Sequence, residues 1–206
     1  MHNMARKTQA DKAYISLKNN LLARNIEEGE RLSEKFWADK LDVNRGDIRS
    51  ALARLFSDGL AVKGEKGGFF AREYSQLCIE QLNEARTALE ISAAMIAIKK
   101  ANEQDFQELK DICESMHNMA KNGYMFGFSE ADVHFHATFV KASHNPKLIE
   151  IYETARIPVT ATRKFLDIEE TKDELAKIAN EHCLIFKYLK DKDLEKLIAL
   201  IRDSIR

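Results

Sequence analysis

Hydrophobic side chains recur at helical spacing along most of the 206 residues, and the pattern changes character near residue 74. Before that point we expect short elements: helices at about 11–24, 33–41 and 44–56, then strands at about 60–63 and 68–72. After it, longer helical segments follow at about 76–101, 103–122, 128–143, 146–166, 170–190 and 192–205. The pattern predicts a mainly α protein, with three short helices and a β-hairpin followed by an all-α bundle of about six helices.

Glycine marks the boundary between these two parts, because six of the eight glycines lie before residue 74. We therefore expect a flexible arm at residues 1–10, one domain at 11–74 and a second, all-helical domain at 75–206. In the second domain, Asn145 has the side chain of an N-terminal cap for the helix that begins at Pro146. Pro158 lies inside the same apolar pattern and is predicted to kink that helix.

The third expected helix, in the stretch NRGDIRSALARLF, has two distinct faces. Arg45 and Arg49 share one face, and Asn44 has the side chain of a helix cap. Three short helices and a hairpin that carries Lys66 describe a winged helix-turn-helix, whose third helix enters the major groove of DNA. The alternative is that both arginines lie on an ordinary solvated face. The other face of the helix is an apolar stripe with core spacing: Ile48, Ala51, Leu52 and Leu55.

Charge and composition limit the partners of the chain. Residues 1–74 carry 14 Lys and Arg against 11 Asp and Glu, a net charge of +3, whereas residues 75–206 carry −4. The basic excess of the first part is compatible with DNA binding if its charges share one surface. The chain has no run of about 18 apolar residues and no signal-peptide core at its start, so we expect a cytoplasmic protein outside the membrane.

The cysteines Cys78, Cys113 and Cys183 are scattered without Cys-x-x-Cys spacing. Their odd number indicates a reducing compartment without a disulfide framework, and we expect each to be a small, buried apolar side chain. His117 and His144 have no ligand spacing and are expected at structural or surface positions.

The stretch SEADVHFHATF places Asp132 and His136 four residues apart, on one face of a helix. The two side chains could hold a metal ion together or pair as an ordinary helical acid and base. The spacing alone favours the ordinary pair. His134 points away from this face, so we expect it to be structural or exposed.

Residues 11–74 resemble the DNA-binding domain of the GntR family of bacterial transcriptional regulators. The run GERLSEKFWADKLDVNRGDIRSALARLFSDGLAVKGEKGGFF carries the resemblance. It departs from the family pattern at Gly46 and Asp47, where a hydroxyl residue and a proline are usual, so the operator sequence does not follow. The resemblance implies a double-stranded DNA operator, with the wing in the minor groove, and these candidate DNA-binding residues: Arg31, Asn44, Arg45, Arg49, Lys66 and Gly67.

Residues 75–206 resemble the FCD domain, the effector-binding helical bundle of the FadR subfamily within the GntR family. The stretches EARTALE, ADVHFHATFVKASHNPKL and NEHCLIFKYLKDKDLEKLIALIRDSI carry this resemblance. It implies a divalent transition metal such as Zn, Ni or Mn, bound by Asp132, His136 and His182. Ser204 stands where the family has a further histidine, and a hydroxyl is a poorer ligand than an imidazole.

The same resemblance implies a small carboxylate effector beside the metal, with Arg86 and Ser204 as candidate contacts. Arginine suits this role because it can donate two parallel hydrogen bonds to a carboxylate. The alternative for Arg86 is an ordinary salt bridge with Glu90, one helical turn further along. Arg156 and Arg163 are weaker candidates for the effector contact, because surface exposure explains them equally well.

These features predict a transcriptional regulator, not an enzyme, that binds DNA as a homodimer and responds to a small organic acid. Two alternatives remain: a metal-dependent hydrolase that activates water with the Asp/His cluster, and a helical interaction module without a ligand. The sequence lacks an HExxH-type motif, and a hydrolase would have no use for the N-terminal DNA-binding pattern.

Overall fold

A computed structural model of the chain describes residues 8–22, 25–155 and 172–205. The chain forms two compact units, the first ending at Tyr74 and the second beginning at Ser75. The described residues form helices and one two-stranded antiparallel sheet, so the mainly α fold class is confirmed. No described helix is both long enough and apolar enough to cross a membrane.

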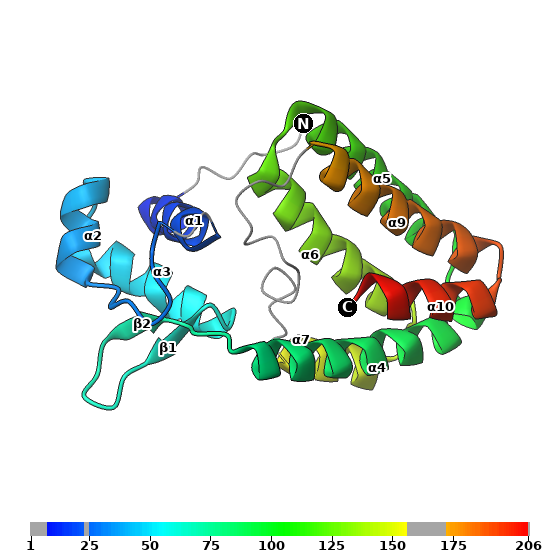
Figure 1. The fold of residues 1–206 in the computed structure, drawn as a ribbon, viewed down its shortest axis with the longest axis horizontal. Coiled ribbons are helices and arrows are strands. Elements are labelled where there is room, and N and C mark those ends of the chain that lie inside the picture. Colours follow the sequence, from blue (N-terminus) through cyan, green and yellow to red (C-terminus); the bar gives the residue numbers. More distant parts are fainter. Residues whose placement is uncertain (1–7, 23–24, 156–171, 206) are drawn as a thin grey trace. The chain divides into compact units, whose positions relative to one another are not determined.

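The first unit contains the helices α1 (Gln9–Leu22), α2 (Glu34–Leu41) and α3 (Arg45–Ser57), followed by the strands β1 (Ala61–Lys63) and β2 (Phe69–Ala71). β1 and β2 pair in an antiparallel hairpin (Figure 1). Ser33 caps α2 by accepting a hydrogen bond from the backbone N–H of Phe36, as the sequence predicts. Trp37 and the apolar stripe of α3 lie in a core that α1 completes with Tyr14 and Leu17.

The start of α1 differs from the predicted extent of the N-terminal arm, residues 1–10. Thr8 Oγ1 accepts a hydrogen bond from the Asp11 backbone N–H at 3.1 Å, and Asp11 Oδ2 accepts one from the Thr8 backbone N–H at 3.0 Å. This reciprocal capping starts the helix at Gln9, so assigning residues 9 and 10 to a flexible arm is wrong. Residues 1–7 of the arm, and 23–24 at the predicted end of this helix, lie outside the described residues.

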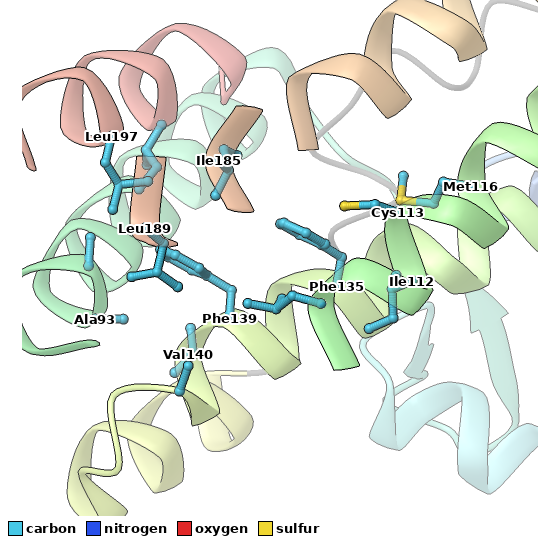
Figure 2. Packing of buried hydrophobic residues seen from close by; sticks show 14 of the residues in the cluster. Ala93, Ile112, Cys113, Met116, Phe135, Phe139, Val140, Ile185, Leu189 and Leu197 are labelled. Atoms are coloured by element: carbon cyan, nitrogen blue, oxygen red, sulfur yellow. The ribbon is translucent and has the colours of Figure 1, made fainter. Parts of the chain in front are cut away.

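The second unit is a helical bundle. Its helices are α4 (Gln76–Lys100), α5 (Glu103–Asn122), α6 (Met125–Lys141), α7 (Pro146–Ala155), α9 (Lys172–Lys190) and α10 (Leu194–Ser204). α5 packs against α6 and α9, and α10 packs against α4 and α9 (Figure 1). Phe135 and Phe139 of α6 lie in the core with Ile185 and Leu189 of α9 and Leu197 of α10 (Figure 2).

Several boundaries in the bundle differ from those expected. α6 begins at Met125 instead of 128, because Gly123, with φ of 66°, ends α5 in the left-handed conformation and the chain turns at once. Asp193 caps α10, which therefore begins at Leu194 instead of 192. Asn145 Oδ1 accepts from the Leu148 backbone N–H at 3.4 Å, as expected of a cap. The predicted continuation of α7 to residue 166, with the kink at Pro158, lies outside the described residues.

The cysteines occupy different environments. Cys113 is buried, but Cys78 and Cys183 are half-buried, so the expectation of three buried thiols is wrong for these two. Cys78 lies in the first turn of α4, and Cys183 lines an open surface cavity between α5 and α9.

Candidate functional site

The predicted recognition helix α3 has one buried and one exposed face, as the sequence pattern indicates. Its buried side chains are Ile48, Ala51, Leu52 and Leu55. The candidate DNA-binding residues of the first unit are all exposed: Arg31, Asn44, Arg45, Arg49, Lys66 and Gly67. The fold therefore places all six residues on the surface of the first unit.

The N-terminus of α3 is fixed by side-chain hydrogen bonds. Asn44 Oδ1 accepts from the Asp47 backbone N–H at 2.9 Å, and Asn44 Nδ2 donates to Asp47 Oδ2 at 2.5 Å. Asp47 therefore bonds to the side chain of the capping residue. In a capping box it would bond to the backbone N–H of that residue instead. Both polar groups of Asn44 hold the helix end, which gives this candidate residue a structural role.

Arg49 is held by a neighbouring helix. Its Nε lies 3.0 Å from Glu34 Oε1 and its Nη2 lies 2.9 Å from Glu34 Oε2, a bidentate pair that orients the guanidinium on the exposed surface. Glu34 is a positioning residue that the sequence reasoning missed. The signal was its place directly after the cap of α2, from which it faces α3 in a helix-turn-helix.

The hairpin turn depends on two glycines. Gly67 and Gly68 have φ angles of 85° and 84°, in the left-handed region that L side chains rarely adopt. A Cβ atom at Gly68 would lie 3.6 Å from Arg31 Nε, so the Arg31 side chain lies beside the turn. The backbone of Arg31 pairs with Phe70 of β2, which fixes this arginine at the base of the wing.

In the second unit, α6 and α9 bring together the three predicted metal ligands. Asp132, His136 and His182 are all fully buried. His182 Nε2 lies 3.0 Å from Asp132 Oδ1 and 3.1 Å from His136 Nε2, and His136 Nε2 lies 3.9 Å from Asp132 Oδ1. His134 is exposed on the same helix, as expected.

The second nitrogen of each imidazole faces an acceptor. His182 Nδ1 lies 2.8 Å from the carbonyl oxygen of Ile178, and His136 Nδ1 lies 3.0 Å from Glu90 Oε2. A carbonyl or carboxylate oxygen only accepts, so these contacts assign a proton to each Nδ1. The two Nε2 atoms face each other and Asp132 Oδ1.

Glu90 connects the cluster to α4 and α7. Besides His136, it bonds to Arg86, whose Nε lies 2.8 Å from Glu90 Oε1, and to Tyr152, whose hydroxyl donates to the same oxygen at 3.1 Å. Arg86 and Glu90 are both fully buried, so the salt bridge considered as the alternative for Arg86 is present, but in the interior. Sequence spacing pointed to Glu90, whereas nothing in the sequence identified Tyr152.

Burial and charge set the protonation of this network. Burial raises the pKa of Glu90, but His136 and Arg86 more than offset it and hold that pKa at about 2. Burial, reinforced by the positive charge of Arg86, lowers the pKa of His136 to about 4. At neutral pH His136 is therefore neutral, which is the form that binds metals.

The donor set fits a divalent transition metal. Two donors that each lie about 2.1 Å from an ion are about 3.0–3.4 Å apart in octahedral or tetrahedral geometry. The distances from His182 Nε2 to Asp132 Oδ1 and to His136 Nε2 are close to this range. Two neutral imidazoles and a carboxylate suit zinc, nickel and manganese. Glu90 and the Ile178 carbonyl hold the ring orientations, as partners behind metal-bound histidines do.

Ser204 makes a hydrogen bond within its own helix. Its half-buried hydroxyl donates to the Ile201 carbonyl of α10 at 3.3 Å. Among the His, Cys, Asp and Glu side chains of the described part of the chain, the convergent donors are Asp132, His136 and His182. Arg156 and Arg163 lie outside the described residues.

Comparison with protein families identifies both units. The model of the FCD domain matches residues 81–206, and the model of the bacterial regulatory proteins of the gntR family matches residues 9–70. The chain belongs to the GntR family of transcriptional regulators and carries an FCD domain. The resemblance inferred from the sequence motifs is therefore confirmed.

Individual proteins show the same relationship. An uncharacterised HTH-type transcriptional regulator of Bacillus subtilis, YdhC, is 26% identical over 88% of this chain and 81% of its own. The regulator McbR of Escherichia coli is 25% identical over 87% of this chain and 81% of its own. The solved structure of E. coli McbR/YncC superposes with a TM-score of 0.73 at 22% identity, covering 97% of this chain and 94% of that one, which shows the shared fold.

For this GntR regulator, the hydrolase alternative finds no support. Family members are transcriptional regulators. A hydrolase would also need a general base near the metal, and the Glu90 carboxylate beside His136 is occupied by Arg86, His136 and Tyr152.

Proposed function

We propose that this regulator binds an operator through α3 and the hairpin, and that its FCD domain holds a divalent transition metal and a small carboxylate effector. The convergence of Asp132 Oδ1, His136 Nε2 and His182 Nε2 in a fully buried cluster carries the proposal for the second unit. These three residues would hold the metal, which supplies a positive centre for an anionic ligand. Arg86, Glu90 and the Ile178 carbonyl fix the charge and orientation of the ligands.

The charge of the cluster supports both ligands. Arg86 places a buried positive charge beside the buried carboxyl groups of Glu90 and Asp132. Uncompensated charge is costly in a protein interior, so a divalent ion held by the cluster favours an anionic ligand beside it.

The chemistry of the donors also explains why the effector should contact the metal. The three side chains leave part of the coordination sphere of zinc or nickel open. The Ser204 hydroxyl is bonded to the Ile201 carbonyl, and a neutral hydroxyl is a weak ligand for such ions. A carboxylate is the stronger ligand, and Arg86 increases the positive potential of the site.

Titration calorimetry of metal-stripped protein with Zn²⁺ and Ni²⁺ tests the metal site. We expect saturable binding near one ion per chain in the wild type and in His134→Ala, a matched control because His134 is exposed on the same helix. We expect His136→Ala to abolish the binding. Equal metal uptake by wild type and His136→Ala, or no saturable uptake in the wild type, contradicts the proposal. A screen of small mono- and dicarboxylates against metal-loaded and stripped protein then tests the effector.

The DNA-binding part of the proposal is based on the exposed residues of α3 and the hairpin. We propose that Arg45 and Arg49 enter the major groove while Lys66 and Gly67 contact the minor groove, with Arg31 at the wing base. We further propose a homodimer on a pseudo-palindromic operator, because paired half-sites multiply the specificity of a short contact. Selection of bound fragments from genomic DNA, followed by gel shift, identifies the operator; absence of any enriched sequence contradicts this part of the proposal.

A further inference from the structure

Two buried polar atoms of the second unit make no hydrogen bond to any described residue. They are Ser129 Oγ on α6 and Asn83 Oδ1 on α4. Ser129 is 3% exposed, and Asn83 is half-buried, although its Oδ1 atom is inaccessible to solvent. A buried hydroxyl or amide normally has a partner, because leaving one unpaired costs free energy. The two atoms therefore require an explanation, and a polar ligand that bonds to them is one.

Ser129 shares a face of α6 with two of the proposed metal ligands. Asp132 and His136 follow it by three and seven residues, which is the spacing of a single helical face. All three side chains are buried. The Ser129 hydroxyl therefore lies about one helical turn before the carboxylate that is proposed to bind the metal.

Asn83 has the same relation to the buried face of α4, because Arg86 and Glu90 follow it by three and seven residues. α4 and α6 pack against each other and run in the same sense across the bundle (Figure 1). They are joined where Glu90 Oε2 lies 3.0 Å from His136 Nδ1. Asn83 and Ser129 each precede this contact by seven residues on their own helix. Both unpaired atoms therefore lie on the same side of the contact.

We propose that Ser129 and Asn83 form a second subsite for the effector, which binds a hydroxyl group on the chain of a small carboxylate. This subsite rests on the proposed function, in which the metal binds the carboxylate. A hydroxyl suits both residues because it can donate one hydrogen bond and accept another. Asn83 Oδ1 can only accept, so the effector hydroxyl donates to it, and the Ser129 hydroxyl donates to the effector oxygen.

The spacing along α6 determines where the effector carries its hydroxyl. Ser129 precedes Asp132 by three residues, which is roughly 4.5 Å along the helix axis. A hydroxyl on the carbon next to the carboxylate stays beside the carboxylate oxygens, within reach of the metal itself. A hydroxyl one or two carbons further along the chain extends toward Ser129. We therefore expect 3- or 4-hydroxy acids to be preferred over 2-hydroxy acids.

Calorimetry of the full-length protein loaded with Zn²⁺ tests the subsite with butyrate and its 2-, 3- and 4-hydroxy derivatives. We expect the 3- or 4-hydroxy acid to bind on the order of tenfold more tightly than butyrate, the effect of added hydrogen bonds. Ser129→Ala and Asn83→Ala should each remove most of this preference without changing Zn²⁺ uptake or butyrate affinity. Ser92→Ala is the matched control, because Ser92 is exposed on α4 and its hydroxyl donates to the Ala88 carbonyl.

Thermal unfolding of the protein without effector distinguishes a ligand contact from a structural one. Ser129→Ala should leave the midpoint unchanged or raise it, because the variant loses an unpaired buried hydroxyl and no hydrogen bond. A lower midpoint would show that the hydroxyl stabilises the fold, and it would overturn the proposal.

Two calorimetric results would also overturn the subsite alone. One is a metal-loaded wild type that binds these acids but prefers neither the 3- nor the 4-hydroxy acid. The other is an unchanged preference in both Ser129→Ala and Asn83→Ala. Absence of Zn²⁺ uptake, or of binding by all four acids, would instead contradict the proposed function, and the subsite with it.

Discussion

Replacing Glu90 by glutamine should destabilise the helical unit strongly, although Glu90 forms an ion pair of the i,i+4 type that is usually weak. The chain contains a matched comparison. Arg86 and Glu90 on α4 are 0% and 1% exposed, whereas Lys110 and Glu114 on α5, with the same spacing and order of charges, are 55% and 63% exposed. The variants Glu90→Gln and Glu114→Gln thus remove the same charge from the same helical geometry at opposite extremes of burial.

The expected magnitudes follow from burial. Breaking a buried ion pair leaves an uncompensated charge and costs about 3–5 kcal/mol, whereas an exposed helical pair contributes about 0.2–0.5 kcal/mol. Glu90 also accepts hydrogen bonds from His136 and Tyr152, and glutamine cannot serve all three partners equally well. We therefore expect Glu90→Gln to lie at the upper part of the first range, and Glu114→Gln to cost less than about 0.5 kcal/mol.

Chemical denaturation followed by circular dichroism measures these differences in the free energy of unfolding. The fluorescence of Trp37, the single tryptophan, is recorded in parallel because it reports the first unit, where it is 2% exposed. We expect the helical transition of Glu90→Gln to move to lower denaturant while the Trp37 transition keeps its midpoint. Equal midpoints for Glu90→Gln and Glu114→Gln would refute the argument that burial makes this pair strong.

Three further predictions concern the DNA contact, the metal site and the dimer. Arg45→Ala should weaken binding to a selected operator by about 1–3 kcal/mol, measured by fluorescence anisotropy. An unchanged affinity would mean that Arg45 does not contact the operator. Ser204→His should tighten Zn²⁺ or Ni²⁺ binding in calorimetry, because imidazole is the better ligand, and an unchanged affinity would mean that the end of α10 does not reach the cluster. Sedimentation at micromolar concentration should show a dimer; a monomer with and without operator would contradict the symmetric binding mode.

Local features of the fold could be predicted from the sequence because they depend on neighbouring residues. The stripe of Ile48, Ala51, Leu52 and Leu55 is buried as its spacing indicates. The caps at Ser33, Asn44 and Asn145 form through side chains adjacent to the backbone groups that they bind. The Asp132 and His136 pair lies on one face of α6 for the same reason.

Features that depend on tertiary packing could not be predicted in this way. Tyr152 reaches Glu90 across 62 positions of sequence, and only the packing of α7 against α4 brings them together. The exposure of Cys183 depends on the cavity between α5 and α9, which no periodicity records. The burial of the Arg86–Glu90 pair could likewise not be predicted from spacing alone, because the spacing is the same for a buried and an exposed pair.

The position of Ser204 has a consequence for regulation under the proposed function. A site with three protein donors leaves room for an effector carboxylate on the metal, so the effector binds well only when the metal is present. By linkage the effector must then raise the affinity for the metal by the same factor as the metal raises the affinity for the effector. A fourth protein ligand would weaken this coupling by occupying the shared position. Ser204→His should therefore tighten metal binding and weaken effector binding at once, a combination that a general improvement in folding would not produce.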